Sequence, residues 1–282
     1  MGGDQRATVA ELLQRFEEGV RGLTDSDSWR SYLRVQARFH RYSLGNVLLM
    51  LAQRPQGLTR VAGYETWRSL GRHVRKGEKG IRILAPVTVR RADDLADEDE
   101  TRAPQTATRF RVVHVWDYSQ TDGEALAENP CRDLRMTTEA GRDLYARLLD
   151  IARAEGIPVH EDRTDLGAAK GVYVPGMHAI GIAAGLAGDQ KAKTLAHELA
   201  HALLHRSGDR PRDEEEAEAE GVAYVVCTWA GLDVDDYSFG YVAGWAGRKD
   251  GSALVRRVGA TIQKTAAAII DQLAPAEARR SA

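Results

Sequence analysis

Residues 194–205 read Thr-Leu-Ala-His-Glu-Leu-Ala-His-Ala-Leu-Leu-His and contain the sharpest signal in the chain. His197 and His201, four residues apart, lie on one face of a helix, where a ring nitrogen from each can reach one Zn²⁺ at about 2.0 Å. Glu198 beside them can take a proton from a water whose pKa the zinc has lowered to about 7. The spacing therefore predicts a zinc site of catalytic type on a helix over 189–205.

Such a site needs a third protein ligand and an open position for water. A histidine six residues beyond His201 is excluded because a serine stands there. A carboxylate from the next helix, expected over 213–229, is the other solution, and the candidates are Glu216, Glu218 and Glu220. We prefer Glu216 as the ligand, and Glu220, one turn further, could instead accept the free N–H of a ligand histidine and orient its ring.

Hydrophobic periodicity predicts an α+β fold for the second half of the chain. Pro175-Gly176 between two β-prone arms indicates a hairpin over 171–182. The expected helices span 138–154, 189–205, 213–229 and 252–273, the last with Val255, Val258, Ile262, Ile269 and Leu273 on one side.

The first half carries most of the positive charge. Residues 1–91 contain 17 Lys and Arg against 8 Asp and Glu, although the whole chain has a net charge of −2. This asymmetry suggests that one half meets a polyanion, or that a solvated basic face balances the acidic half. A length of 282 residues favours two domains.

A domain boundary is expected at 128/129, within a linker near 125–136. The first domain, 1–128, is expected to be mixed α and β, with an acidic loop over 92–108 between strands over 81–89 and 110–115. Its expected helices span 8–23, 29–40, 46–53 and 64–70.

The basic stretch mixes cations with aromatic rings, as a site for single-stranded nucleic acid requires: cations hold phosphates and flat rings stack on bases. The alternative is that the rings belong to the core and the cations are simply solvated. The candidate DNA-binding residues are Arg41, Tyr42, Asn46, Tyr64, Trp67, Arg68, Arg72, Arg75, Lys76 and Lys79.

This stretch resembles the N-terminal single-stranded-DNA-binding domain of ArdC antirestriction proteins. The resemblance rests on Tyr42-Ser-x-x-Asn46, on Trp67 followed by Leu-Gly-Arg72, and on Lys76-Gly-Glu-Lys79. It covers about residues 8–128. The acidic stretch 93–100 departs from what a DNA surface requires, so it should lie away from the bound strand.

The second half resembles the zincin-like metallopeptidase domain of the ImmA/IrrE type, also found in ArdC proteins, over about residues 137–273. The matching motifs are the histidine motif and Glu216-x-x-Ala-Glu220. The resemblance implies His197, His201 and Glu216 as metal ligands and Glu198 as the catalytic residue. It assigns no transition-state stabiliser; the candidates are Tyr173, His178, Tyr224 and Tyr237, and His205 is expected to have a structural or orienting role.

The leading hypothesis is an ArdC-like antirestriction protein that binds single-stranded DNA and hydrolyses a protein or peptide substrate with Zn²⁺. The alternative is a non-enzymatic DNA-binding antirestriction protein with a structural metal site. No apolar run reaches the roughly 18 residues of a membrane span, and the first residues lack the order of a secretory signal, so a cytoplasmic location is expected. The oligomeric state is not predicted.

Overall fold

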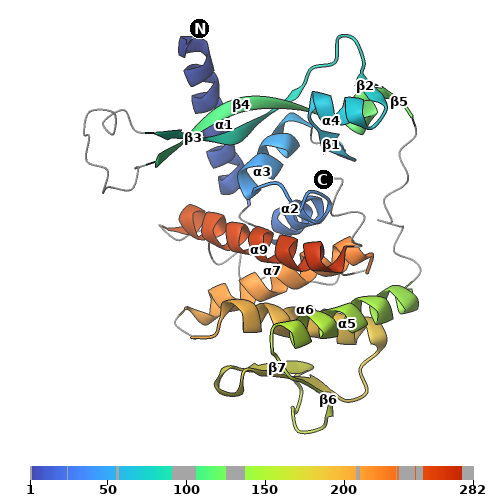
Figure 1. The fold of residues 1–282 in the computed structure, drawn as a ribbon. Coiled ribbons are helices and arrows are strands. Elements are labelled where there is room, and N and C mark those ends of the chain that lie inside the picture. The colour runs from blue at the N-terminus through green and yellow to red at the C-terminus, as the bar shows by residue number, and fades with distance from the viewer. Residues whose placement is uncertain are drawn as a thin grey trace, which may run out of the picture. The chain divides into compact units, whose positions relative to one another are not determined.

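The computed structural model describes residues 2–23, 25–54, 57–90, 106–124, 137–207, 210–232, 234, 245 and 250–274. Helices and three small sheets make up these residues, which confirms the α+β class (Figure 1). The chain divides into two compact units, one of residues 1–19 with 48–126 and one of residues 20–47 with 127–282.

This division differs from a continuous first domain over 1–128, because residues 20–47 group with the second unit. Helix α2 (Ser26–Arg38) packs on α7 (Arg212–Ala230). Trp29 is fully buried, and its ring lies close to Gly259 of α9 (Gly251–Leu273). The apolar face of a helix can be recognised in the sequence, but the unit that covers this face cannot.

The first unit contains two antiparallel sheets, ordered β1-β4-β3 and β2-β5. Helices α1 and α3 belong to it in part. Its elements are α1 (Gly2–Gly22), α3 (Leu44–Gln53), β1 (Val61–Ala62), α4 (Tyr64–Ser69), β2 (Arg72–Val74), β3 (Ile81–Arg90), β4 (Thr106–Asp117), the 3₁₀ turn η2 (Tyr118–Gln120) and β5 (Thr121–Gly123).

Strands β3 and β4 form the long hairpin of this unit, paired from Ile81 with Val115 to the far end at Arg90 and Thr106. Alternation buries Ile81, Ile83 and Val115 on one face. Because β4 begins at Thr106, the end of the expected loop over 92–108 is strand; residues 92–105 and the expected linker 125–136 lie outside the described residues.

The second unit is a stack of helices on one three-stranded sheet, ordered β6-β8-β7, with β6 parallel and β7 antiparallel to β8. Its remaining elements are α5 (Thr137–Ala154), β6 (Val159–Arg163), β7 (Gly171–Val174), the 3₁₀ turn η3 (Pro175–Met177), β8 (Ala179–Ala183) and α6 (Gly188–Leu204). The sheet contacts α6, which also packs against α5 and α7 (Figure 1).

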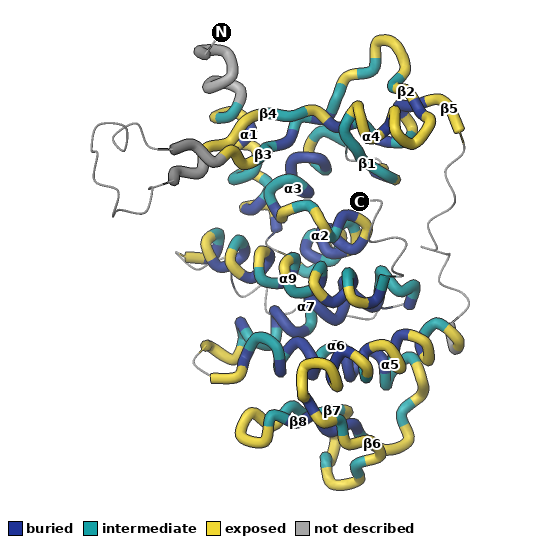
Figure 2. Tube along the Cα trace, viewed as in Figure 1, coloured by how far each residue is buried: buried dark blue, intermediate teal, exposed yellow. Residues whose placement is uncertain are grey.

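Helices α6 and α7 are largely buried (Figure 2). The side of α7 that faces α9 is tightly packed: a Cβ atom at Gly221 would come within 2.3 Å of Ile262. The five apolar residues predicted on one side of the last helix are all buried. Within the described ranges, no helix combines the length and the apolar character that crossing a membrane requires.

Candidate metal centre and nucleic-acid interface

Helices α6 and α7 bring together the three side chains expected to bind metal. The Nε2 atoms of His197 and His201 lie 3.1 Å apart. An Oε2 atom of Glu216 lies 3.5 Å from the Nε2 atom of His197 and 3.8 Å from that of His201. Among the described residues, this is the one group of three potential ligands whose atoms all lie within 4.8 Å of one another.

These separations fit a tetrahedral ion. Two ligand atoms that each lie about 2.0 to 2.1 Å from one zinc ion are about 3.3 Å apart at the tetrahedral angle. The measured values of 3.1, 3.5 and 3.8 Å bracket this figure. The adjacent imidazoles of His197 and His201 hold the pKa of Glu216 far below its usual range, so this side chain is a carboxylate and a competent ligand.

Glu198 lies beside the ligands and is nearly buried, with 8% of its surface exposed. Burial raises the pKa of Glu198, although His197, His201 and a hydrogen bond from the Tyr173 backbone N–H oppose the rise. A raised pKa is typical of a carboxylate that exchanges protons near neutral pH.

The edge strand β7 runs directly over Glu198. A Cβ atom at Gly171 would come within 2.5 Å of Thr194 and 2.9 Å of Glu198, so only glycine permits this approach. The Ala183 N–H donates to the Lys170 carbonyl, and the alternation of an antiparallel pair then points the backbone groups of Gly171 and Tyr173 away from β8. The outer edge of β7 therefore presents backbone groups beside the metal site.

The two other glutamates considered as ligands lie elsewhere around the site. Glu218 is fully buried and accepts from the Nε2 atom of His205 at 3.0 Å, so it does not face the ligand group. Glu220 lies near enough to His197 for their charges to interact, and one of its oxygens has no partner. Its expected role as acceptor for a ligand histidine stays a prediction.

Of the four candidates for transition-state stabilisation, the three that the structure describes differ in their burial and in their contacts. Tyr224 is fully buried, and Tyr237 lies outside the described residues. The Tyr173 hydroxyl lies 2.9 Å from the Nδ1 atom of His178, whose Nε2 atom contacts Arg206. Tyr173 is also the residue whose backbone contacts Glu198, so of the three described candidates it is best placed to meet a substrate.

Three of the residues expected to bind DNA group with the second unit rather than the first: Arg41, Tyr42 and Asn46. The Arg41 guanidinium pairs with Asp271 of α9 at 3.1 Å, and the Tyr42 carbonyl accepts from Gln36 at 3.1 Å. This ion pair and this hydrogen bond therefore stabilise the packing of residues 20–47 within the second unit.

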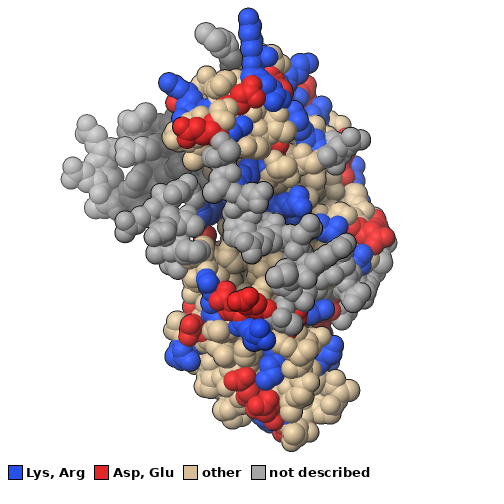
Figure 3. Space-filling view, turned by 90° about the vertical axis from the view of Figure 1, so that its right-hand side faces the viewer, with Lys and Arg blue, Asp and Glu red and all other residues tan. Residues whose placement is uncertain are grey.

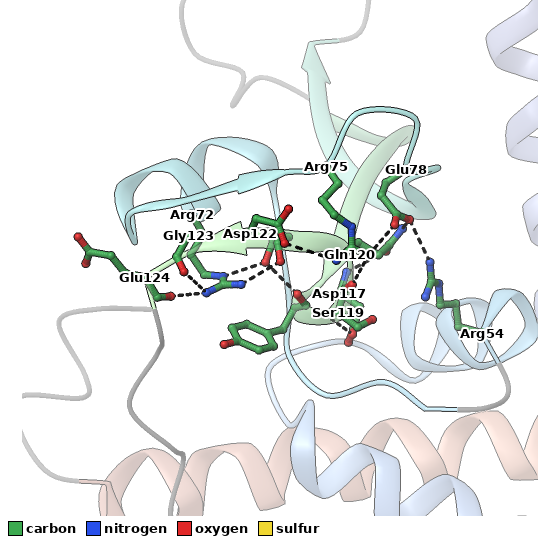
Figure 4. Close-up of polar contacts among 12 residues, drawn as sticks. Arg54, Arg72, Arg75, Glu78, Asp117, Ser119, Gln120, Asp122, Gly123 and Glu124 are labelled. Atoms are coloured by element: carbon green, nitrogen blue, oxygen red, sulfur yellow. Dashed lines mark hydrogen bonds and ion pairs between the residues drawn. The ribbon is translucent and has the colours of Figure 1, made fainter.

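Two more expected residues are structural in the first unit. Trp67 is 1% exposed, and its indole N–H donates to the Trp116 carbonyl at 2.9 Å, so its ring is not available to stack on a base in this conformation. Arg72 is 6% exposed, donates to Thr121, Gly123 and Glu124, and lies over the Tyr118 ring (Figure 4). This arginine fastens β2 to β5.

The remaining expected residues lie at the surface. Arg68 pairs with Glu65 at 3.4 Å. Arg75 pairs with Glu78 at 2.8 Å, and Figure 4 shows both of these residues. The others are Tyr64, Lys76 and Lys79, all exposed. Lys and Arg side chains are interspersed with Asp and Glu on the face drawn in Figure 3. Composition alone therefore does not define a basic surface here.

One basic pocket of about 770 Å³ does gather cations in the first unit. Its lining residues are Arg15, Ala52, Gln53, Arg54, Lys79, Gly80, Ile81, Arg82 and His114. This lining carries four permanent cations and no carboxylate, and Lys79 is its one member among the expected DNA-binding residues. The others come from α1, α3, β3 and β4 or, like Arg54 and Gly80, lie next to one of these elements, so their proximity leaves no spacing signal in the sequence.

Aromatic rings continue from this pocket along the outer face of β4. The ring centroid of His114 lies 6.3 Å from that of Trp116, which lies 6.0 Å from that of Tyr64. Tyr64 is 47% exposed. A Cβ atom at Gly80 would come within 3.0 Å of the Trp116 ring, so glycine makes room for it. The unit thus places rings next to cations.

Comparisons with known proteins match two successive parts of the chain. Residues 5–116 match the family model of the N-terminal domain of anti-restriction factor ArdC, and residues 152–228 match that of the IrrE N-terminal-like domain, a peptidase M78 family. No curated protein matches the chain.

Two solved structures match the chain, both of the antirestriction ArdC protein from the R388 plasmid, and the metal-free one is similar in fold. The metal-free structure shares 21% identity over 82% of this chain and 84% of that chain, with a TM-score of 0.51. The Mn(II)-bound structure shares 23% identity over 83% and 85%, with a TM-score of 0.49. The chain therefore matches an ArdC N-terminal domain and an IrrE N-terminal-like domain in the predicted order, and the resemblance to ArdC-like antirestriction proteins is confirmed.

Proposed function

We propose that the second unit is a zinc-dependent endopeptidase. The observation that carries this proposal is the convergence of His197, His201 and Glu216 with Glu198 beside them. Two imidazoles and one carboxylate form a ligand set of catalytic zinc sites. When bound, the ion supplies Lewis acidity, which polarises a peptide carbonyl and acidifies water.

The chain's own residues supply the proton transfers and the substrate's orientation. Glu198, held by the Tyr173 N–H, takes a proton from the attacking water and passes it to the leaving amide nitrogen. An extended peptide adds along the outer edge of β7, where the outward N–H and C=O of Gly171 and the outward C=O of Tyr173 pair with it, while the Tyr173 N–H stays on Glu198. The peptide bond then lies next to Glu198.

The test is Glu198→Gln, which keeps the size of the side chain and removes its basicity. We expect this variant to bind zinc like wild type and to cleave a peptide library about 10² to 10⁴ times more slowly. Mass spectrometry of the products measures cleavage, and metal analysis of the same samples is the control. Equal cleavage by both proteins would contradict the role of Glu198. Full antirestriction activity in a variant without cleavage would favour the non-enzymatic alternative.

We further propose that the first unit binds single-stranded DNA at the basic pocket and the adjoining rings. Support comes from the four cations of the lining and from the row formed by His114, Trp116 and Tyr64. Phosphates of the strand would enter the pocket, and bases would stack along the row. Antirestriction activity, meaning protection of incoming DNA, would follow from this binding.

The matched pair Arg82→Ala and Arg68→Ala tests the pocket. Both arginines are at least partly exposed and pair with a glutamate, but only Arg82 lines the pocket. Fluorescence anisotropy with a labelled oligonucleotide should give weaker binding for Arg82→Ala and a salt slope reduced by about 0.7, as for one lost phosphate contact. Equal losses in both variants would mean that the pocket has no special role.

A further inference from the structure

A chain of buried polar groups runs from one proposed metal ligand to a glutamate on the next helix. The Nδ1 atom of His201 lies 2.9 Å from the Nδ1 atom of His205, at the end of α6. The Nε2 atom of His205 lies 3.0 Å from Glu218, and a nitrogen of Arg210 lies 2.8 Å from both oxygens of Glu218. His205 is 4% exposed and Glu218 is not exposed at all.

The hydrogen-bonding capacities of these groups allow one arrangement of protons for neutral imidazoles. Arg210 can only donate, and it donates to both oxygens of Glu218, so Glu218 acts as an acceptor in this network. The Nε2 atom of His205 must then carry a hydrogen, which leaves a lone pair on its Nδ1 atom. That lone pair accepts the N–H of the His201 Nδ1 atom, and the lone pair of His201 is therefore on Nε2.

This Nε2 atom is the one that faces His197 and Glu216. We propose that His205 and Glu218 are positioning residues, which fix His201 in the tautomer and ring orientation that metal binding requires. The inference rests on the proposed metal site. Ligand histidines commonly donate their second N–H to a carboxylate, and the loss of such a partner typically weakens metal binding about 10- to 100-fold. Here a second imidazole lies between the ligand and the carboxylate.

The position of Glu218 explains why the intermediate imidazole is needed. Glu216 and Glu218 are two residues apart on α7, so they leave the helix in different directions. Glu216 reaches the Nε2 side of His201, whereas Glu218 reaches His205. Helix α7 thus supplies both Glu216, the third proposed ligand, and Glu218, which holds the ligand His201 in place through His205.

The tautomer of His201 can be read directly in the metal-free wild-type protein. Selective ¹⁵N labelling of histidine, with the His201 signals assigned from a His201 variant, should show its hydrogen on Nδ1 at a pH where the imidazoles are neutral. A hydrogen on Nε2 would overturn the proposal. This measurement needs neither peptidase activity nor a stable Glu218 variant.

Metal affinity supplies the second readout, measured by competition between the protein and a chelator for Zn²⁺. We expect His205→Phe and Glu218→Ala to bind zinc about 10- to 100-fold more weakly. Glu218→Gln keeps an acceptor and should retain most of the affinity. Glu214→Gln is the matched control, since Glu214 is a buried glutamate of the same helix that pairs with Arg257 at 2.7 Å and contacts no histidine in the described chain.

The outcomes separate the two proposals. Wild-type protein that binds no zinc would contradict the metallopeptidase, while the tautomer measurement would still test the positioning residues. Wild-type protein that binds zinc, together with folded Glu218→Ala and His205→Phe variants of unchanged affinity, would overturn the positioning role alone.

Discussion

The candidate metal site and the basic segment differ in how closely their predicted residues lie together in the structure. The histidine motif and Glu216 come together within 4.8 Å. Of the ten residues expected to bind DNA, Trp67 and Arg72 are buried and three others group with the second unit. The difference teaches that a spacing on a helix predicts geometry, whereas a local excess of cations and rings predicts only composition.

The substitution with the largest expected effect is Trp67→Ala, which tests whether this ring belongs to the core. The ring is 1% exposed, so its removal leaves a cavity in the core and should lower the free energy of unfolding by about 3 to 5 kcal/mol. Urea denaturation measures this loss. If Trp67 instead bound a base, the variant would unfold like wild type and lose affinity for the oligonucleotide, which would contradict the placement of the ring in the core.

Tyr64→Ala is the matched control for that prediction, on the same helix α4. Tyr64 is 47% exposed and lies in the row of rings beside the pocket. Its removal should leave stability within about 0.5 kcal/mol of wild type. Affinity for single-stranded DNA should fall by about 1 to 3 kcal/mol if one base stacks on it.

The contrast also shows how much could be predicted from the sequence. The helix over 188–204 and the side chains on its face follow from a fixed period of 3.6 residues, so His197, Glu198 and His201 were found together. The spacing alone left Glu218 and Glu220 open beside Glu216, which the resemblance implied, because the rotation of α7 about its axis depends on packing. Gly221, which lets α7 approach Ile262, is part of that packing.

In the first unit the sequence predicts the long strands but not the short ones. Strands β1, β2 and β5 have two or three residues each, too few for alternation to be recognised. The basic pocket joins Arg15, Arg54 and Arg82 from three elements far apart in the chain. Nothing in local composition distinguishes these arginines from Arg72, which binds backbone carbonyls of its own unit.

Gly171→Ala tests whether the geometry around Glu198 is as exact as the metal motif suggests. The added methyl group would come within 2.9 Å of Glu198, so strand β7 or the carboxylate must shift. A displacement of about 1 Å near the chemistry can lower the rate about 10²-fold. Zinc affinity should change little, because the nearest neighbours of the added methyl group are Thr194 and Glu198 rather than a proposed metal ligand.

Gly176→Ala, in the turn of the same hairpin, is the control for this effect. A Cβ atom at Gly176 has no neighbour within 4 Å, and the residue does not have a positive φ. Its cleavage rate should match that of wild type. Equal losses in both variants would mean that the hairpin's flexibility, rather than its approach to Glu198, controls the rate.

The smallest expected effect concerns Glu220, whose neutral form the site favours when no metal is bound. Burial and, to a lesser extent, the charge of Glu216 raise the pKa of Glu220 to about 7, although His197 and Lys193 oppose the rise. Between about pH 4.5 and 7 the folded protein then holds a proton that the unfolded chain has lost, so this carboxyl group stabilises the fold less as the pH rises. Glu220→Gln cannot ionise and should remove this dependence.

Urea denaturation of the chelator-treated protein on either side of this pH window measures the change. Because Glu220 is partly exposed, solvent reduces the effect to on the order of 1 kcal/mol in the difference between variant and wild type. Glu139→Gln, which neutralises an exposed carboxylate of the same unit, should leave the pH dependence unchanged. A Glu220→Gln protein that keeps the wild-type dependence would show that Glu220 is already ionised in the folded state within this pH window, as it is in the unfolded chain. It would then be a second carboxylate near His197. Helical spacing would still predict the histidines of the site, but it would not predict which carboxylate binds beside them.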